Sequence, residues 1–201
     1  DQDQVPTLST DHGFLQGEDG PPMIVTHCFP DGVVTAAVME SKGATEPAVW
    51  FLTQALADLG SATVRMRSDG EPASKALCQT AAATARLKHG IQVLTERSPV
   101  ESSQSNGAAE GAVKRAKARV RAIARDFCTE HSLARFPQNL LTWVVAHAGD
   151  CMTRHHRGDD VHTPWERRKG RPFGTQGMDV PSSWRCSGPA AALPREGMDV
   201  P

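Results

Sequence analysis

The chain has 201 residues and a formal net charge of −1, a length that suits one domain with a proper hydrophobic core. The charge is unevenly distributed, because residues 1–60 carry nine acidic side chains and a single basic one, Lys42. The remaining residues therefore carry 21 basic and 14 acidic side chains, from totals of 22 and 23. A cationic second half is typical of a protein that meets a polyanion.

The cysteines exclude two classes of small protein. All five lie far apart with no C-x-x-C pair, which argues against a zinc ribbon and a disulfide framework. This pattern favours a reducing compartment, so we expect an intracellular protein, nuclear or cytoplasmic. No apolar run approaches the ~20 residues that a membrane span needs, and the first residues show no signal-peptide pattern, so we expect no membrane partner. Cys151, His155 and His156 could suggest a metal site, but a solvated helix end is the favoured interpretation.

The first sixty residues predict three strands and a helix. The strands are expected at residues 5–15, 23–29 and 33–39, and the turn Pro30-Asp31-Gly32 makes a hairpin of the last two. Thr45 predicts the start of a helix with Pro47 in its first turn, and Gly60 predicts its end.

The next stretch predicts two further strands and three helices. A strand at residues 63–67 leads into Ser68-Asp69-Gly70, and a helix follows from Pro72 to His89, ended by Gly90. A strand at 91–94, a basic helix at about 108–127 and a helix at about 138–154 complete the series. The order β-β-β-α-β-α-β-α-α predicts an α/β fold, a five-stranded mixed sheet flanked by helices.

The last residues differ in kind from the rest. Residues 172–201 are rich in Gly, Pro and Ser, and Gly-Met-Asp-Val-Pro occurs twice, at 177–181 and 197–201. This composition predicts a disordered tail. We therefore divide the chain into a core with a helical extension, residues 1–171, and a tail, residues 172–201.

The basic helix carries two stripes at helical spacing. Its apolar stripe consists of Val113, Ala116, Val120, Ile123, Ala124 and Phe127. Its polar stripe consists of Glu110, Lys114, Lys117 and Arg121. A carboxylate at the head of a row of cations suits a metal ion beside a phosphate backbone. The alternative is an ordinary i,i+4 pair between Glu110 and Lys114, worth about 0.2–0.5 kcal/mol.

Three carboxylates occupy distinctive positions in the predicted elements. Asp11 lies in the first strand, Asp69 follows the fourth strand, and Glu110 begins the basic helix. If the first and fourth strands are neighbours in the mixed sheet, Asp11 and Asp69 lie side by side. Taken singly, Asp69-Gly70 is also a common turn, and Asp11 could be an ordinary strand residue.

Three segments together carry a family resemblance: Ser68-Asp69-Gly70-Glu71-Pro72-Ala73, Ser103-Gln104-Ser105-Asn106-Gly107-Ala108-Ala109-Glu110, and Thr163-Pro164-Trp165-Glu166 with Gly170-Arg171. Over about residues 5–175 the chain resembles the catalytic core of retroviral and Copia-type retrotransposon integrases, the DDE recombinases of the ribonuclease-H-like fold. The resemblance implies that Asp11, Asp69 and Glu110 form a catalytic triad that holds two Mg²⁺ or Mn²⁺ ions.

The resemblance also implies a function and partners. We expect the integrase catalytic domain of a retrotransposon polyprotein, with metal-dependent DNA 3′-end processing and strand transfer. Lys114 and Lys117 match the family's DNA-contacting lysines, Asn106 matches a loop position near the DNA end, and helical geometry alone adds Arg121 to this row. The expected partners are the element's DNA ends, target DNA and a second copy of the chain. The alternatives are a DDE transposase or nuclease, and an inactive or domesticated remnant that binds nucleic acid without catalysis.

Overall fold

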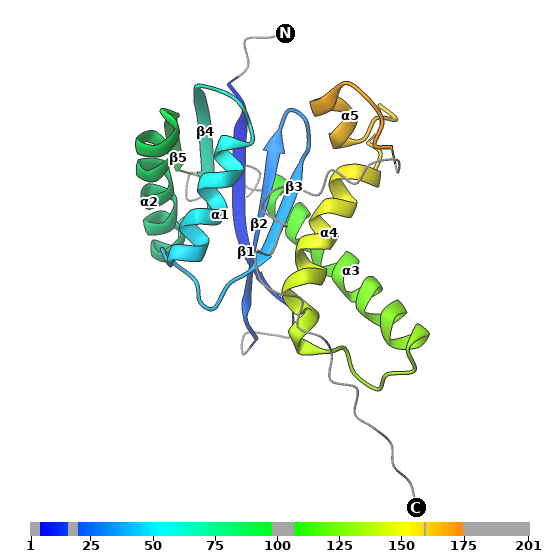
Figure 1. Cartoon of the computed structure of the whole chain (residues 1–201). Coiled ribbons are helices and arrows are strands. Elements are labelled where there is room, and N and C mark those ends of the chain that lie inside the picture. The colour runs from blue at the N-terminus through cyan, green and yellow to red at the C-terminus, as the bar shows by residue number, and fades with distance from the viewer. Residues whose placement is uncertain (1–4, 16–19, 98–106, 159, 175–201) are drawn as a thin grey trace, which may run out of the picture.

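The structure is a computed structural model that describes residues 5–15, 20–97, 107–158 and 160–174 (Figure 1). Its elements are β1 (Thr7–Phe14), β2 (Pro22–Phe29), β3 (Val34–Val38), α1 (Glu46–Ala57), β4 (Thr63–Ser68), α2 (Pro72–His89), β5 (Gln92–Arg97), α3 (Gly107–Glu130), the short 3-10 helix η1 (Gln138–Leu140), α4 (Leu141–His155) and α5 (Pro164–Lys169). The predicted order of strands and helices is confirmed as far as α4.

The strands form one sheet in the order β3-β2-β1-β4-β5. β1 pairs antiparallel with β2 and parallel with β4, so the predicted mixed sheet is confirmed. β2 and β3 form the predicted hairpin, and the parallel pair β4 and β5 is joined through α2. The first and fourth strands are therefore neighbours, as the side-by-side placement of Asp11 and Asp69 requires.

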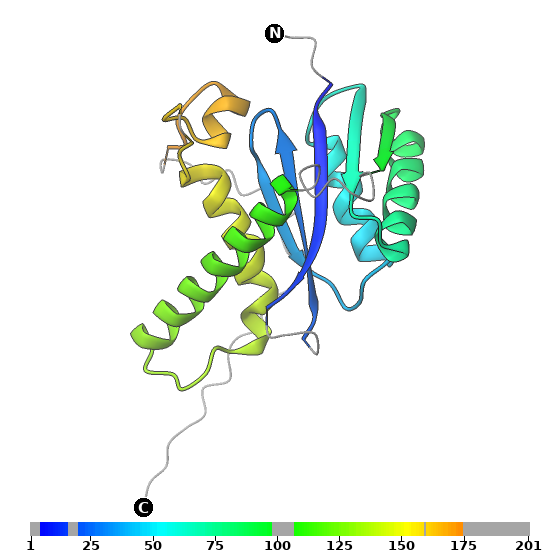
Figure 2. The ribbon, with the colours of Figure 1, turned by 180° about the vertical axis from the view of Figure 1, so that it is seen from behind.

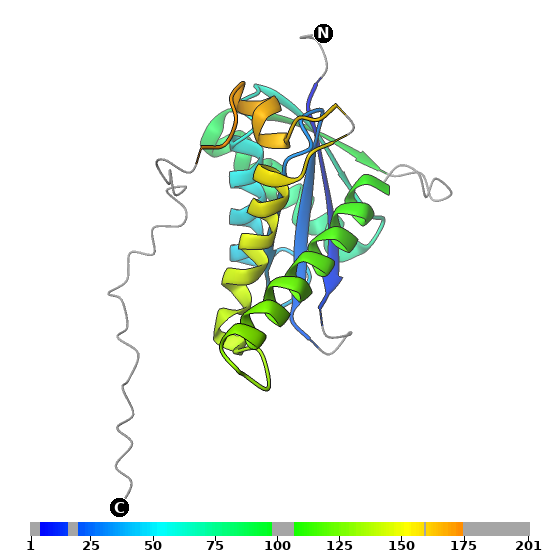
Figure 3. The same ribbon diagram turned by 90° about the vertical axis from the view of Figure 1, so that its right-hand side faces the viewer.

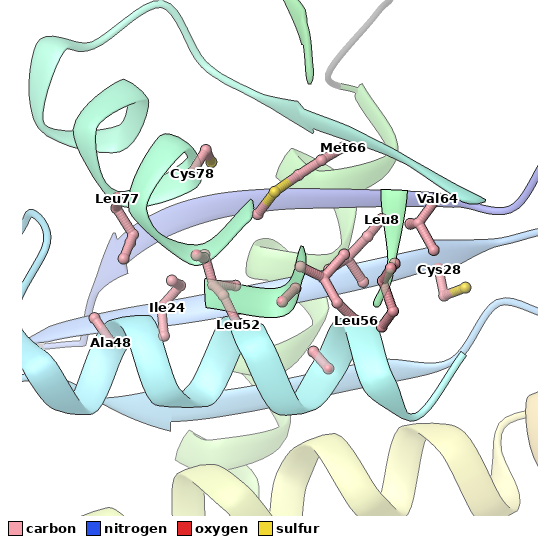
Figure 4. Packing of buried hydrophobic residues seen from close by; sticks show 14 of the residues in the cluster. Leu8, Ile24, Cys28, Ala48, Leu52, Leu56, Val64, Met66, Leu77 and Cys78 are labelled. Carbon is pink, nitrogen blue, oxygen red and sulfur yellow. The ribbon is translucent and has the colours of Figure 1, made fainter. Parts of the chain in front are cut away.

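The helices cover the two faces of this sheet. Figures 1 and 2 show α1 and α2 on one face and α3 and α4 on the other. On the first face, alternate strand residues such as Leu8 and Met66 pack against Leu52, Leu56 and Leu77 of the helices (Figure 4). The second face has its own core, which consists of Met23, Val25, Val34 and Ala36 from the strands with Val113, Val120, Val144 and Val145 among the helical residues. Fully burying each large apolar side chain contributes about 1.5–3 kcal/mol, which holds both helical layers to the sheet.

Local signals explain where the helices begin and end. α2 runs from Pro72 to His89 as predicted, and Gly90 ends it with a φ of +68° in the left-handed region. α1 begins at Glu46, but its last residue is Ala57, earlier than predicted. α3 continues past the predicted end at Phe127 to Glu130.

α5 is an element that the sequence pattern did not predict. Thr163 Oγ1 accepts the backbone N–H of Glu166 at 3.1 Å, and Glu166 Oε2 accepts the backbone N–H of Thr163 at 2.6 Å. This reciprocal capping box starts a helix of six residues, too short to show an apolar period. Figure 3 shows α5 at the same end of the molecule as the turn between β2 and β3.

Two further predictions concern the ends of the chain and membranes. The predicted tail lies outside the described residues from position 175 on. In the described parts of the chain, every helix is too short or too polar to cross a membrane.

Candidate active site

The parallel pairing of β1 and β4 brings two of the predicted site residues together. Thr10 of β1 pairs with Ser68 of β4, and this is the last pair of the parallel ladder. Asp11 and Asp69 each follow directly in the sequence, so they lie beside each other. Side chains alternate along β1, and Leu8 packs into the core beneath α1 and α2. Asp11 therefore faces the opposite side of the sheet, the side on which α3 lies.

Glu110 reaches the same side from the first turn of α3. Figure 2 shows the start of this helix beside β1, near the end of β4. Burial raises the pKa of Asp11, and the negative charges of Asp69 and Glu110 raise this pKa further. The backbone N–H of His12, which donates to Asp11 Oδ1 at 2.7 Å, and the charge of Lys42 act in the opposite direction. The charges of Asp69 and Glu110 thus both act on the carboxyl group of Asp11.

The oxygens of this site suit a hard divalent cation. Asp69 Oδ1 is buried and has no hydrogen-bond partner among the described residues, so one carboxylate oxygen is left uncompensated by the protein. Carboxylate oxygens are the donors that Mg²⁺ and Mn²⁺ prefer. Glu110 is exposed, and within the described ranges no three His, Cys, Asp or Glu side chains are close enough together to hold an ion. Joint coordination by Asp11, Asp69 and Glu110 would require these side chains to move closer together.

Two of the basic side chains of α3, Lys117 and Arg121, lie against the end of β1. A Cβ built on Gly13 would stand 2.7 Å from Lys117 Cε and 3.2 Å from Lys117 Nζ, so the lysine side chain lies across the strand two residues after Asp11. Arg121 Nη2 donates to the backbone oxygen of Leu15 at 3.4 Å. Lys114 is exposed, and Asn106 lies outside the described residues.

Two residues near the carboxylates were missed from the sequence. Lys42 Nζ donates to both carboxylate oxygens of Glu71 at 3.0 Å, and its charge acts on Asp11. His12 Nδ1 lies 3.4 Å from Ser74 Oγ, and burial lowers the pKa of His12. One feature of the sequence could have pointed to Lys42, since it is the single basic residue among residues 1–60. The only feature that could have pointed to His12 is its position next to Asp11.

The alternative metal site at the end of α4 does not gather its three candidate residues. Cys151 Sγ lies 3.5 Å from His147 Nε2, one turn earlier on the same helix. His155 and His156 are exposed, and His155 packs edge-on against Phe173 with ring centroids 5.7 Å apart. These histidines therefore belong to a solvated helix end.

Comparison with known proteins finds a similar solved structure but no match by sequence. No protein-family model matches the chain, and no curated protein matches it. Among solved structures, the catalytic core domain of BIV integrase matches with a TM-score of 0.54 and 19% sequence identity, over 82% of this chain and 93% of that one. The chain therefore has the fold of a retroviral integrase catalytic core, a mixed α/β sheet with helices on both faces.

Proposed function

We propose that this chain is an integrase catalytic core that carries out metal-dependent DNA 3′-end processing and strand transfer. The observation that carries the proposal is the parallel pairing of β1 with β4, which brings Asp11 beside Asp69 on the side of the sheet where α3 and its Glu110 lie. Burial raises the pKa of Asp11, and the negative charges of Asp69 and Glu110 add to this effect, as expected for neighbouring carboxylates. These carboxylates lie in a fold shared with the BIV integrase core, which supports the same class of chemistry.

Each part of the site has a role in this proposal. Asp11, Asp69 and Glu110 would hold two Mg²⁺ or Mn²⁺ ions, which when bound help to activate a hydroxyl and stabilise a leaving oxygen. In strand transfer, a DNA 3′-hydroxyl oxygen forms a bond to a target phosphorus, and the opposite bond from that phosphorus to a 3′-oxygen breaks. β1 fixes the position of Asp11, whereas Glu110 stands exposed at the head of α3.

The cations would position the DNA. Lys117 and Arg121 lie along the end of β1, and Lys114 stands exposed on the same helix. Contacts from such side chains to phosphates fix the register of a duplex but carry little sequence preference. Asn106, which precedes α3 in the sequence, completes the proposed DNA-binding set.

The origin and organisation of the chain form part of the same proposal. The segment Thr163–Arg171 supports a Copia-type retrotransposon polyprotein, with residues 1–171 as its integrase core and residues 172–201 as a tail. Such a protein would act on the element's DNA ends and target DNA inside the cell, as a multimer.

The decisive experiment compares the native chain with Glu110→Gln in Mn²⁺-dependent cleavage and joining of a branched DNA substrate. The substitution removes a charge and a metal ligand at nearly constant volume. Glu130→Gln is the matched control, because Glu130 is exposed at the far end of the same helix. We expect activity in the native chain and in Glu130→Gln, and loss of activity in Glu110→Gln.

The other outcomes identify the alternatives. No activity in any of the proteins, with salt-sensitive DNA binding retained, would indicate a remnant that binds nucleic acid without catalysis. Cleavage without joining would indicate a nuclease. Equal activity in the native chain and Glu110→Gln would contradict the assignment of the site.

A further inference from the structure

The loop between β3 and α1 brings a lysine to the carboxylate end of the sheet. Figure 1 shows this loop below the sheet, where it joins the lower ends of β3 and α1. Gly43 has a φ of +115°, a conformation that favours glycine, and it directs the chain immediately after Lys42. The Lys42 ammonium lies 5.3 Å from the centroid of the Phe14 ring and 3.0 Å from each carboxylate oxygen of Glu71.

Lys42 and Lys117 flank the same piece of β1 from opposite faces. Lys117 lies across Gly13 on the α3 side, and Lys42 lies over Phe14. Adjacent residues of a strand point to opposite faces, and Glu71 adjoins the first turn of α2, on the other face of the sheet. The segment that follows Asp11 is therefore bordered by a cation on each side.

The ion pair between Lys42 and Glu71 is accessible enough for Lys42 to exchange Glu71 for another anion. The side chains of Lys42 and Glu71 are 31% and 45% exposed, and ion pairs this accessible are weak in water. The charge of Lys42 also lowers the pKa of Asp11 and of His12, so its field reaches the carboxylate site. A phosphate brought to this site would compete with Glu71 for the ammonium group.

We propose that Lys42 is a phosphate-binding residue of the site, which exchanges Glu71 for a phosphate of bound DNA on the face opposite Lys117. This inference rests on the proposed function, because it takes DNA as the ligand. In this proposal Lys42 adds a second phosphate contact to that of Lys117, so that lysines on both faces of β1 hold the DNA backbone. The competing explanation is structural: Lys42 would only tie the β3–α1 loop to the start of α2.

The first test measures binding of a labelled DNA duplex without divalent metal, over a series of salt concentrations. We compare the native chain with Lys42→Gln and Lys42→Arg, and with Lys88→Gln as the control of equal charge change. Lys88 is exposed in the last turn of α2, at the opposite end of that helix from Glu71. Lys42→Gln should weaken binding several-fold and reduce the slope of log affinity against log salt by about one, whereas Lys42→Arg should restore both.

The second test uses the sign of the effect of Glu71→Gln. If Lys42 leaves Glu71 to bind phosphate, the substitution removes a competitor and a nearby negative charge, and DNA binding should strengthen. It should strengthen less in the presence of Lys42→Gln. A purely structural role predicts weaker or unchanged binding in Glu71→Gln, and either result would overturn the proposal.

The binding data distinguish a wrong role for Lys42 from a wrong function for the whole chain. Salt-dependent binding by the native chain, with the same slope in Lys42→Gln and Lys88→Gln, would overturn the role of Lys42 and leave the DNA-binding function standing. No salt-dependent binding by the native chain would overturn both. Thermal unfolding of each variant verifies that the comparison is made between folded proteins.

Discussion

The side chain of Lys117 lies directly against Gly13, the residue of β1 that stands between His12 and Phe14. Any side chain at Gly13 would enter space that α3 already occupies, because a Cβ there would stand 2.7 Å from both Lys117 Cε and Val113 Cγ1. The lysine chain can swing aside, but Val113 is short, buried and fixed to the helix. The close approach of α3 to β1 thus requires a glycine at this position.

We expect Gly13→Ala to lower the free energy of unfolding by about 1–3 kcal/mol, the usual cost of overpacking. It should also weaken DNA binding, since Lys117 must move. Chemical denaturation measures the first effect and a duplex-binding titration the second. Gly107→Ala is the control, because a Cβ at Gly107 meets no atom within 4 Å. Equal stability of Gly13→Ala and the native chain would contradict the close packing.

Asp11 should make the stability of the metal-free protein depend on pH. Burial, Asp69 and Glu110 raise the pKa of Asp11 in the folded state above its ordinary value of 3.8. An ionised Asp11 therefore destabilises the folded state at neutral pH, and this cost disappears as the pH falls through the raised pKa towards the ordinary one. Asp11→Asn should melt at a higher temperature than the native chain at neutral pH, and the difference should vanish in acid.

Adding Mn²⁺ should reverse this order. The ion would stabilise the native chain by binding to the folded state, and Asp11→Asn should gain less. Thermal unfolding at several pH values, with and without Mn²⁺, measures both effects. A lower melting temperature of metal-free Asp11→Asn at neutral pH would show that the charge of Asp11 is well compensated.

Asp31 should anchor α5 to the sheet. Its Oδ2 accepts Arg168 Nε at 2.6 Å, and its backbone oxygen accepts Arg167 Nη1 at 3.1 Å. The side chains of Asp31 and Arg168 are only 17% and 20% exposed, so this pair is better shielded from water than a surface pair. Asp31→Ala should lower the free energy of unfolding by about 1–3 kcal/mol, the range for hydrogen bonds to charged groups.

Asp126→Ala is the matched control for this change. Asp126 and Arg125 form a pair whose side chains are 74% and 78% exposed, and such pairs contribute little to stability. Limited proteolysis should also cut Asp31→Ala more readily near α5. If both variants unfold at the same denaturant concentration, the docking of α5 does not depend on Asp31.

The cysteines should differ in their reactivity towards alkylating reagents. Burial, and then the charge of Asp31, raise the pKa of Cys28 to about 12, and burial also raises the pKa of Cys78 and Cys151. The thiolate is the reactive form, so Cys28 should stay unmodified at mildly alkaline pH. Half-buried Cys128 should react first among the four cysteines of the described residues. Peptide mapping by mass spectrometry after brief treatment with iodoacetamide gives the order, and early modification of Cys28 would contradict it.

Much of the architecture follows from local patterns in the sequence. Alternation of apolar residues marks Val64 and Met66 as one face of a strand, and both are buried against α1 and α2. Pro72 and Gly90 set the ends of α2 because one favours the first turn of a helix and the other takes the left-handed conformation that ends it. These signals act within a few residues, so they can be found without knowing the fold.

Sequence patterns also indicated that Asp11 lies within a strand, that Asp69 follows a strand and that Glu110 begins a helix. The contacts of the site could not be predicted in this way. The pairing of β1 with β4, with Thr10 opposite Ser68, makes Asp11 and Asp69 neighbours. Lys42 meets Glu71 and Phe14, and α5 docks on Asp31, 137 residues before Arg168. These contacts join segments far apart in the chain, and their energies depend on the path of the whole backbone, which no local pattern of residues specifies.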